Sequence, residues 1–507
     1  MLIEVPKVKE AFLKKIEKIV GPLGYSSKNL DRLNYARDSS FKATIQMKYA
    51  KVEHFPDVIA WPRSVDEVQK LVKLAVAFKM PVVPFGAGSG VCGGTIPVKG
   101  GMIIDVKKMN RLITLDTENL VVEAESGIMS MGLEDQLERR GYTLGHFPSS
   151  IICASLGGCL AARSAGQLSS RYGKIEDMVL NLEMVTGSGE VVSTRNVNNS
   201  SGFDLNQLFI GSEGTLGIIT KASLRIFPQP RTRAFRSVSF KDMPTSIEAI
   251  RRFMQLGVKP AVVRLYDELD TLLLVSSKST GGKIREHGWS DKIKEMIKFS
   301  GLKAMLHSPR LLNASGKFFS RQCAVIFMFE GHEAIVREEK EMVMDLCLEM
   351  GAQDLGEKPA RHWYENRYRV SYNASPLFHT GHFTDTIEVA ASWDRVPLLY
   401  EKMVQAISPH AMIMAHLSHV YTDGGALYFT FVAPLRGLKS GEKMYDLIWE
   451  KAMKTCLGAG GTISHHHGIG RLKAKYMTDE WGEGLALYKE LKNYYDPHHL
   501  MNPGKLM

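Results

Sequence analysis

The alternation of apolar and polar positions changes character along the chain. The first 50 residues begin with apolar positions at helical spacing, in VKEAFLKKIEKIVGPLG, and continue into a polar, loop-like stretch. From residue 57 to residue 228, short apolar runs such as DVIAWP, PVVPFG and LVVEAESG alternate with the helical segments VDEVQKLVKLAVAFK and MGLEDQLERRG, and further runs follow near NLEMVTGSGEVV and GIITKASLRIF. This pattern predicts strands separated by helices.

After Pro228 and Pro230 the pattern becomes a strand followed by a helix, repeated three times and closed by a hairpin around TDGG. The pairs are AFRSVSF with PTSIEAIRRFMQLG, AVIFMFEG with HEAIVREEKEMVMDLCLEMG, and TIEVAAS with RVPLLYEKMVQAIS. Such pairs are typical of an antiparallel sheet with helices on one face. We therefore expect an α+β protein with an N-terminal helical segment (1–52), a first domain (53–230), a second domain (231–458) and a C-terminal tail (459–507).

Composition narrows the class of protein. A hydrophobic fraction of 44% and a charged fraction of 23% are ordinary for a globular chain, and 507 residues allow two or three lobes. No uncharged apolar run approaches the ~20 residues of a membrane span, and the first residues lack the pattern of a signal peptide, so we expect a soluble, cytoplasmic protein. The six cysteines are scattered without a C-x-x-C pair, so they indicate neither a disulfide framework nor a zinc or iron–sulfur motif.

The net charge of +10 is unevenly distributed. Between residues 278 and 321, ten Lys and Arg residues face three Asp and Glu residues, in a stretch that contains the amphipathic segment SDKIKEMIKFSGLKAML. We interpret this stretch as a solvated helix face. The alternative is a basic, apolar-backed flap that touches a membrane surface or an amphiphilic substrate. No Arg-rich recognition helix or aromatic RNA-binding signature appears, so nucleic acid is not an expected partner. The expected assembly is a homo-oligomer.

Three clusters of small residues indicate a long ligand. In PFGAGSGVCGG, residues 84–94, the glycines allow a tight turn whose successive N–H groups can bind an anion. The cluster is neither a G-x-G-x-x-G that opens a helix nor a P-loop. ASLGGCLAARSAGQLSSRYG (154–173) and FIGSEGTLGIIT (209–220) follow, each beside a predicted strand. Three such clusters in order favour a ligand that the backbone approaches closely along its length.

With GHFPSS at 145–150, the order of these motifs resembles the FAD-binding, PCMH-type domain of the vanillyl-alcohol oxidase superfamily, over residues 53–230. The resemblance implies that the first loop holds the FAD pyrophosphate and that the later segments line or close over the flavin. Because this loop offers Ser89 and Val91 rather than a tethering histidine, we expect non-covalent FAD. The cofactor-binding residues implied are Pro84, Gly86, Ala87, Gly88, Ser89, Gly90, Pro148, Ser149, Ser150, Gly157, Gly158, Ala162, Ser164, Gly166, Tyr172, Gly173, Glu213, Gly214, Gly217 and Ile219.

The C-terminal half resembles two branches of flavoenzymes. Like alkyldihydroxyacetonephosphate synthases, it has a tail reading SHHHGIGR, a strand ALYFTF with Tyr428 and a segment VVRLYD with Arg264. This resemblance implies exchange of an acyl for an alkyl group on dihydroxyacetone phosphate at the flavin N5. Arg264 would bind the phosphate or a carboxylate, and Tyr428, His465, His466 and His467 would move protons.

The second branch is the D-2-hydroxy-acid dehydrogenases of D-lactate or glycolate type, whose tails read S-G-E-H-G-I-G and whose hairpins read G-H-x-G-D-G-N-x-H. The ending DPHHLMNPGK is similar to theirs, and alignment of the tails places His467 on the histidine that both branches have. His467 would then take the hydroxyl proton of the substrate. Because the chain has no iron–sulfur cysteines, such an enzyme would need a partner protein as electron acceptor.

A metal site is not expected, because Tyr428 stands where the dehydrogenases have the second histidine of their hairpin. The alternative is a divalent ion bound by His416, His419 and His466, the last of which aligns with a metal-binding glutamate of the dehydrogenases. A third function class is a non-catalytic flavin subunit that relays electrons, but such a module needs no cluster of His, Tyr and Arg residues.

Each candidate residue also has an ordinary structural interpretation. Arg264 could form an ion pair, Tyr428 could be a core aromatic residue, and we expect His465 to face outward. Alternation along an extended tail would direct His466 one way and its two neighbours the other, so that only one side meets the substrate. We expect His467 to be the acid–base residue.

Overall fold

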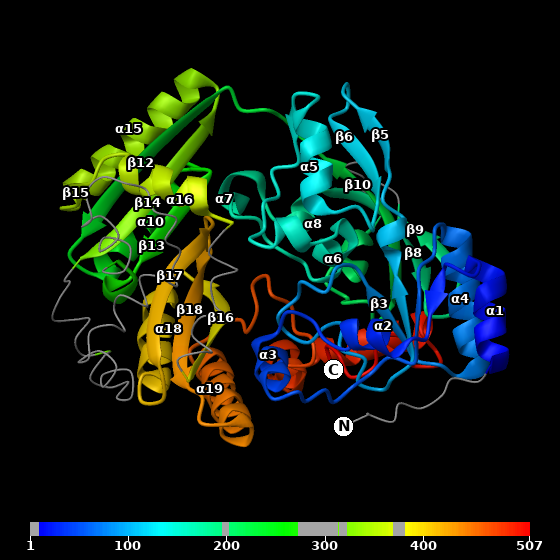
Figure 1. Cartoon of the computed structure of the whole chain (residues 1–507). Helices are drawn as coiled ribbons and strands as arrows, with labels where there is room; N and C mark the ends of the chain where they lie inside the picture. Colours follow the sequence, from blue (N-terminus) through cyan, green and yellow to red (C-terminus); the bar gives the residue numbers. More distant parts are fainter. Residues whose placement is uncertain (1–9, 195–201, 272–312, 314–321, 369–380) are drawn as a thin grey trace, which may run out of the picture. The chain divides into compact units, whose positions relative to one another are not determined.

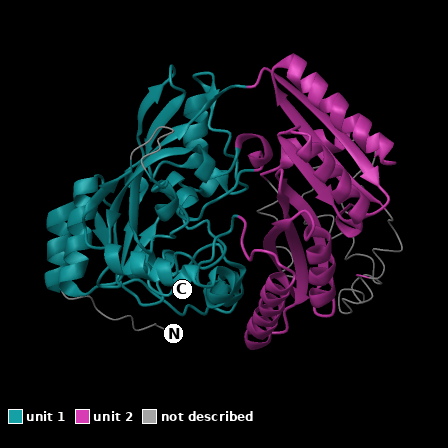
Figure 2. Cartoon of the chain, turned by 180° about the vertical axis from the view of Figure 1, so that it is seen from behind, with its two compact units in different colours: residues 1–166, 173–229, 466–507 teal, residues 167–172, 230–465 magenta. Residues whose placement is uncertain are grey.

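The computed structural model describes residues 10–194, 202–271, 313, 322–368 and 381–507. The described residues within 1–166, 173–229 and 466–507 form a first unit, and those within 167–172 and 230–465 form a second unit (Figure 2). The N-terminal segment and the tail from His466 onward thus belong to the same unit as the predicted cofactor loops. The basic segment 278–321 lies outside the described residues, apart from Asn313.

The first unit opens with a small sheet of largely parallel strands (Figure 1). Its strands read VIA, VVPF and MIID, and such continuous apolar runs are typical of parallel strands buried on both faces. One face packs on the helix Val65–Phe78, which begins where Ser64 Oγ accepts a hydrogen bond from the Glu67 N–H at 3.2 Å. In order across the sheet the strands are β1 (Tyr25–Ser26), β2 (Val58–Ala60), β4 (Met102–Asp105) and β3 (Val82–Phe85).

The second sheet of this unit is antiparallel, and β10 lies at its centre, between β6 and β8. The strands predicted near NLEMVTGSGEVV and GIITKASLRIF are confirmed as β8, β9 and β10. In order the strands are β5 (Leu112–Asp116), β6 (Val121–Glu125), β10 (Gly217–Arg225), β8 (Val179–Thr186) and β9 (Val191–Ser193), while β7 (Tyr142–Thr143) pairs separately with β11 (Phe227–Pro228).

The polar stretch before residue 50 is not only loop, as the sequence suggested, because it contains two short helices, α2 and α3. The helix α3 buries only Ala43 and Ile45, which is too little apolar surface for a clear helical pattern. The described helices of this unit are α1 (Glu10–Val20), α2 (Asn29–Asn34), α3 (Phe41–Lys48), α4 (Val65–Phe78), α5 (Ser130–Glu138), α6 (Leu156–Ala161), α8 (Ile175–Met178), α9 (Asn206–Phe209), α20 (Met477–Trp481) and α21 (Gly484–Tyr495).

The second unit contains the predicted antiparallel sheet, and the hairpin around TDGG is confirmed as the turn between β17 and β18. In order across the sheet the strands are β15 (Gln353–Asp354), β12 (Thr232–Phe240), β14 (Cys323–Gly331), β13 (Val262–Tyr266), β17 (Met412–Val420), β18 (Gly424–Pro434) and β16 (His382–Ser392). Its described helices are α7 (Ser169–Tyr172), α10 (Met243–Gln255), α15 (Glu333–Glu349), α16 (Lys358–Asn366), α18 (Val396–Ile407) and α19 (Leu438–Gly458).

Long helices cover one face of this sheet (Figure 1). Phe253 of α10 packs edge-on against Phe327 of β14, with ring centroids 5.8 Å apart. Tyr400 of α18 stacks on Phe429 of β18 at 6.4 Å. Since side chains alternate along a strand, the residues next to these aromatic positions, including Arg264 and Tyr428, point to the other face. No helix in the described part of the chain is long and apolar enough to cross a bilayer.

The C-terminal residues bind back onto β3 of the first unit. Val82 donates its N–H to the Leu500 carbonyl at 2.8 Å and accepts one from the Asn502 N–H at 2.7 Å. The turn that makes this possible is held by the buried Lys492, whose ammonium donates to Asp496 at 2.5 Å and to the Thr215 carbonyl. The motif DPHHLMNPG therefore has a structural role in this chain.

Lys492→Ala should lower the free energy of unfolding by about 3–5 kcal/mol, because it leaves the buried Asp496 carboxylate without its cation. Lys70→Ala is the matched control, since Lys70 forms an exposed i,i+4 pair with Asp66 whose loss should cost about 0.5 kcal/mol or less. Urea unfolding measures both. Equal losses in the two variants would contradict the role given to Lys492.

Candidate active site

In the first glycine loop, residues 86–90, three carbonyls accept hydrogen bonds from neighbouring parts of the first unit. The Gly86 carbonyl accepts a hydrogen bond from Lys107 Nζ at 2.9 Å, the Gly88 carbonyl from Ser39 Oγ at 3.1 Å, and the Gly90 carbonyl from the Ser39 N–H at 3.0 Å. Among the described residues, no acceptor is found for the amides of residues 87–90. A run of N–H groups left in this way suits a pyrophosphate, so the loop fits FAD.

Two glycines of this loop cannot carry a side chain. Gly88 has φ +67°, and a Cβ there would lie 2.7 Å from the Phe85 ring. A Cβ at Gly86 would clash with Ser155 Oγ, the hydroxyl that also accepts the Gly158 N–H at the start of α6. The structure therefore brings the first and second predicted cofactor segments together at Ser155.

The remaining predicted cofactor residues divide between the two units, since Tyr172 belongs to the second unit and the others to the first. Gly166 lies against the segment GHFPSS, since a Cβ added at Gly166 would lie 2.5 Å from the Phe147 nitrogen. Gly214 lies against Pro84, since a Cβ added at Gly214 would lie 2.7 Å from the Pro84 ring. Ser164 Oγ bonds His146 Nε2 at 2.9 Å, and burial lowers the pKa of His146 to about 3, so this imidazole is neutral. Tyr172 instead belongs to the second unit, where its hydroxyl donates to Glu330 at 2.7 Å.

Four side chains form a row across one face of the sheet in the second unit, opposite the face that carries Phe327 and Phe429. Tyr266 of β13 pairs with His416 of β17, His416 with Tyr428 of β18, and Tyr428 with Glu388 of β16. Directly paired residues lie on the same face with Cβ atoms ~5 Å apart. The four strands thus place four titratable side chains next to one another, and we call Tyr266, His416, Tyr428 and Glu388 the polar row.

Arg264, two residues before Tyr266 on β13, lies on the same face and is joined to His416 of the row. Arg264 Nη2 lies 2.6 Å from His416 Nε2, and His416 Nδ1 lies 3.3 Å from Asp270 Oδ2. Burial and then the Arg264 charge lower the pKa of His416, against the opposing effect of Asp270. The guanidinium also lies 5.3 Å from the Trp363 ring, and its buried Nε has no acceptor among the described residues. Arg264 therefore keeps a donor for an anion.

Tyr428 is more than a core aromatic residue. Its ring stacks on His416 with centroids 4.9 Å apart, and its hydroxyl donates to Thr386 Oγ1 at 2.9 Å. Burial raises the pKa of Tyr428 to about 12. At neutral pH this sheet face therefore offers the Arg264 cation, the neutral imidazole of His416 and the neutral phenol of Tyr428.

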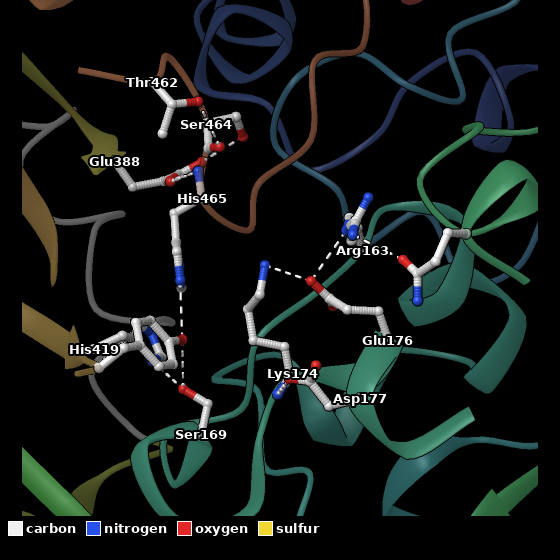
Figure 3. Close-up of polar contacts among 12 residues, drawn as sticks. Arg163, Ser169, Lys174, Glu176, Asp177, Glu388, His419, Thr462, Ser464 and His465 are labelled. Carbon is white, nitrogen blue, oxygen red and sulfur yellow. Dashed lines mark hydrogen bonds and ion pairs between the residues drawn. The ribbon is translucent and has the colours of Figure 1, made fainter. Parts of the chain in front are cut away.

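Glu388 connects the polar row to the tail (Figure 3). This fully buried carboxylate accepts hydrogen bonds from Ser464 Oγ at 2.8 Å and from the His465 N–H at 2.6 Å. His465 Nε2 in turn lies 2.9 Å from the Tyr421 hydroxyl. His465 is half-buried and bonded, which differs from the outward-facing position that we expected.

Two further hydroxyl contacts extend this chain of hydrogen bonds. The Tyr421 hydroxyl lies 3.0 Å from Ser169 Oγ, which lies 2.8 Å from His419 Nδ1. The rings of His419 and His465 stack with centroids 5.1 Å apart. Sequence reasoning missed Glu388, Tyr421 and Ser169; for Glu388 the only signal was an acidic residue in the apolar strand TIEVAAS.

The three consecutive histidines do not alternate as on a strand, because residues 465–467 form a bend. The rings of His466 and His467 meet edge to face, with centroids 4.6 Å apart. His416 and His419 lie in different clusters, since the former contacts Arg264 and Asp270 and the latter contacts Ser169. The alternative metal site predicted from the sequence, His416, His419 and His466, is therefore not formed as a set, because His416 is bonded to Arg264 and Asp270.

These features define a flavoprotein with a PCMH-type FAD-binding fold and an antiparallel second domain. A family model described as FAD binding domain matches residues 56–195, and one described as FAD linked oxidases, C-terminal domain, matches residues 229–506. The chain belongs to the FAD-linked oxidase family. The members of this family are enzymes, and their cofactor is FAD.

Relatives come from both predicted branches. The chain is 30% identical to an alkyldihydroxyacetonephosphate synthase of Dictyostelium discoideum, over 100% of this chain and 82% of that protein. It is 28% identical to a mitochondrial D-lactate dehydrogenase [cytochrome] of Arabidopsis thaliana, over 92% of this chain and 76% of that protein. A solved alkyldihydroxyacetonephosphate synthase superposes with a TM-score of 0.79 at 27% identity, covering 99% of this chain and 86% of the other.

Gly88→Val should abolish FAD retention, because its side chain would enter the Phe85 ring and the φ of +67° is unfavourable for a β-branched residue. Gly132→Val in α5 is the control, since a Cβ there meets nothing within 4 Å. The ratio of flavin absorbance to protein in the purified variants measures retention. A full complement of FAD in the Gly88 variant would remove this loop from the cofactor site.

Proposed function

We propose that the enzyme exchanges an acyl for an alkyl group on dihydroxyacetone phosphate or a closely related phosphate, as the name of its synthase relatives suggests. The observation that carries the proposal is the arrangement of Arg264, His416 and Tyr428 on one sheet face. Arg264 supplies a cation with an unused Nε donor for the phosphate. His416, which a metal-binding hydroxy-acid site would need, is bonded at both ring nitrogens.

The proposed exchange conserves electrons and moves one proton. The ester carbon–oxygen bond to the fatty acid breaks, an ether bond to the fatty alcohol forms, and the hydroxyl proton of the alcohol ends on the departing carboxylate. When bound, FAD supplies the reactive N5 at which the resemblance places this exchange. The chain's own residues have to hold the phosphate and pass the proton. Arg264 suits the first task, and the imidazoles of His465–His467 with the Tyr428 phenol suit the second.

The second candidate is oxidation of a D-2-hydroxy acid with transfer of electrons to a partner protein. It is supported by the similarity to D-lactate dehydrogenases, 28% identity with the protein of Arabidopsis thaliana. In that reaction His467 would take the substrate hydroxyl proton. The dehydrogenase-like ending does not favour it, because in this chain DPHHLMNPG binds β3 and the Lys492 ammonium.

The two candidates differ in what 2-hydroxy acids do to the flavin. Under anaerobic conditions, D-lactate, D-2-hydroxyglutarate and glycolate should leave the absorbance of bound FAD unchanged, because the proposed reaction has no net hydride transfer. Rapid bleaching by any of these acids would replace the proposed exchange by the dehydrogenase reaction. Dithionite provides the control that the flavin can be reduced.

His467→Ala should keep FAD and lower kcat by about 10²–10⁴-fold, which is the usual worth of a general acid–base group. The control is His498→Ala, the same change at an exposed position of the same tail. Steady-state assays normalised to bound FAD provide the measurement. Wild-type turnover in the His467 variant would remove the catalytic centre from both candidate reactions.

A further inference from the structure

The segment that follows the three histidines is bound by a single carboxylate of the first unit. Glu213 Oε1 accepts the Ile469 N–H at 2.5 Å, and Glu213 Oε2 accepts the Gly470 N–H at 2.7 Å. Both oxygens of the side chain are therefore used by the tail. These two amides begin two residues after His467.

The backbone around Glu213 is adapted to this contact. Glu213 itself has φ +49°, a left-handed conformation that costs a non-glycine residue of order 1–3 kcal/mol and is found at functional sites. Its N–H donates to the Ala161 carbonyl at 3.0 Å, and its carbonyl accepts from Asn502 Nδ2 at 2.7 Å. The main chain is thus fixed on both sides of the side chain that reaches the tail.

The tail is adapted in the same way. Gly468 has φ +77°, and a Cβ there would lie 2.7 Å from Glu213 Oε1, so the carboxylate can approach only because this residue is glycine. The next two amides, of Arg471 and Leu472, both donate to the Cys92 carbonyl, at 3.0 and 3.1 Å. Residues 469–472 are therefore bonded to two predicted cofactor loops, through Glu213 and Cys92.

We propose that Glu213 is a positioning residue of the reaction, which fixes His467 by binding the two amides that follow Gly468. The family resemblance implies only a cofactor contact for Glu213, whereas the geometry assigns both of its oxygens to the tail. The proposal rests on the acid–base role proposed for His467. A displacement of about 1 Å at such a group can cost about 10²-fold in rate, so a contact two residues away matters for catalysis.

The test is Glu213→Gln, which keeps the size of the side chain but turns one acceptor into an NH₂ group facing an amide N–H. Glu183→Gln is the control, because Glu183 is a half-buried carboxylate of the same unit that bonds Thr220 Oγ1 and not the tail. Gly468→Ala disturbs the same contact from the tail, because its Cβ would lie 2.7 Å from Glu213 Oε1. This variant replaces Glu213→Gln in the test if the latter fails to fold.

In the FAD-bound protein, Glu213→Gln should speed hydrogen exchange of the amides of 469 and 470 by about tenfold, as expected for one lost hydrogen bond. It should lower kcat per bound FAD by about 10–100-fold with KM within about twofold. Unchanged exchange in the tail would overturn the proposal, and so would a loss of activity that only follows a loss of bound FAD. If the wild-type protein lacked the proposed exchange activity, the proposed function would fail while the amide exchange would still test the contact.

Discussion

Two carboxylates that accept main-chain N–H groups fix the ends of the three-histidine segment, and the candidate chemistry depends on them. In the second unit, Glu388 binds the His465 amide; in the first unit, Glu213 binds the amides of Ile469 and Gly470. A bend carries no ladder of hydrogen bonds, so its amides must find other acceptors or remain unsatisfied. The main chain is thus bonded to a carboxylate directly before His466, in the second unit, and again two residues after His467, in the first unit.

The need of buried polar groups for hydrogen-bond partners also explains the conformation of the cofactor loop and the position of the polar row. The loop at residues 86–90 can leave its amides for an anion because Lys107 and Ser39 satisfy the opposite carbonyls. Arg264 and Glu388 can lie on one face of this sheet because each is bonded there, Arg264 to His416 and Glu388 to Ser464. Of the proposed groups, Arg264 and Tyr428 lie on strands, whereas His465–His467 lie on a bend whose neighbouring amides are bonded to carboxylates.

Much of this organisation could be predicted from the sequence, because it depends on local patterns. Apolar runs and period-two alternation located β8, β10 and the sheet of the second unit, and glycine spacing located the loop at residues 86–90. The contacts of Glu213, Glu388 and Tyr421 could not be predicted, since they depend on strand register and on where the chain returns. The bulge between Leu417 and His419 is one example, because it places His419 opposite Ala426 and so on the same face as His416, whereas residues three apart on a regular strand point to opposite faces.

The most direct measurement of the central claim is an anaerobic assay with acyl-dihydroxyacetone phosphate, a long-chain alcohol and no electron acceptor. If the enzyme carries out the proposed exchange, this assay yields many equivalents of alkyl product and free fatty acid per bound FAD, and the flavin spectrum of the oxidised enzyme is restored at the end. Product that forms only when an electron acceptor is added, or that stops at one equivalent per flavin, would contradict it.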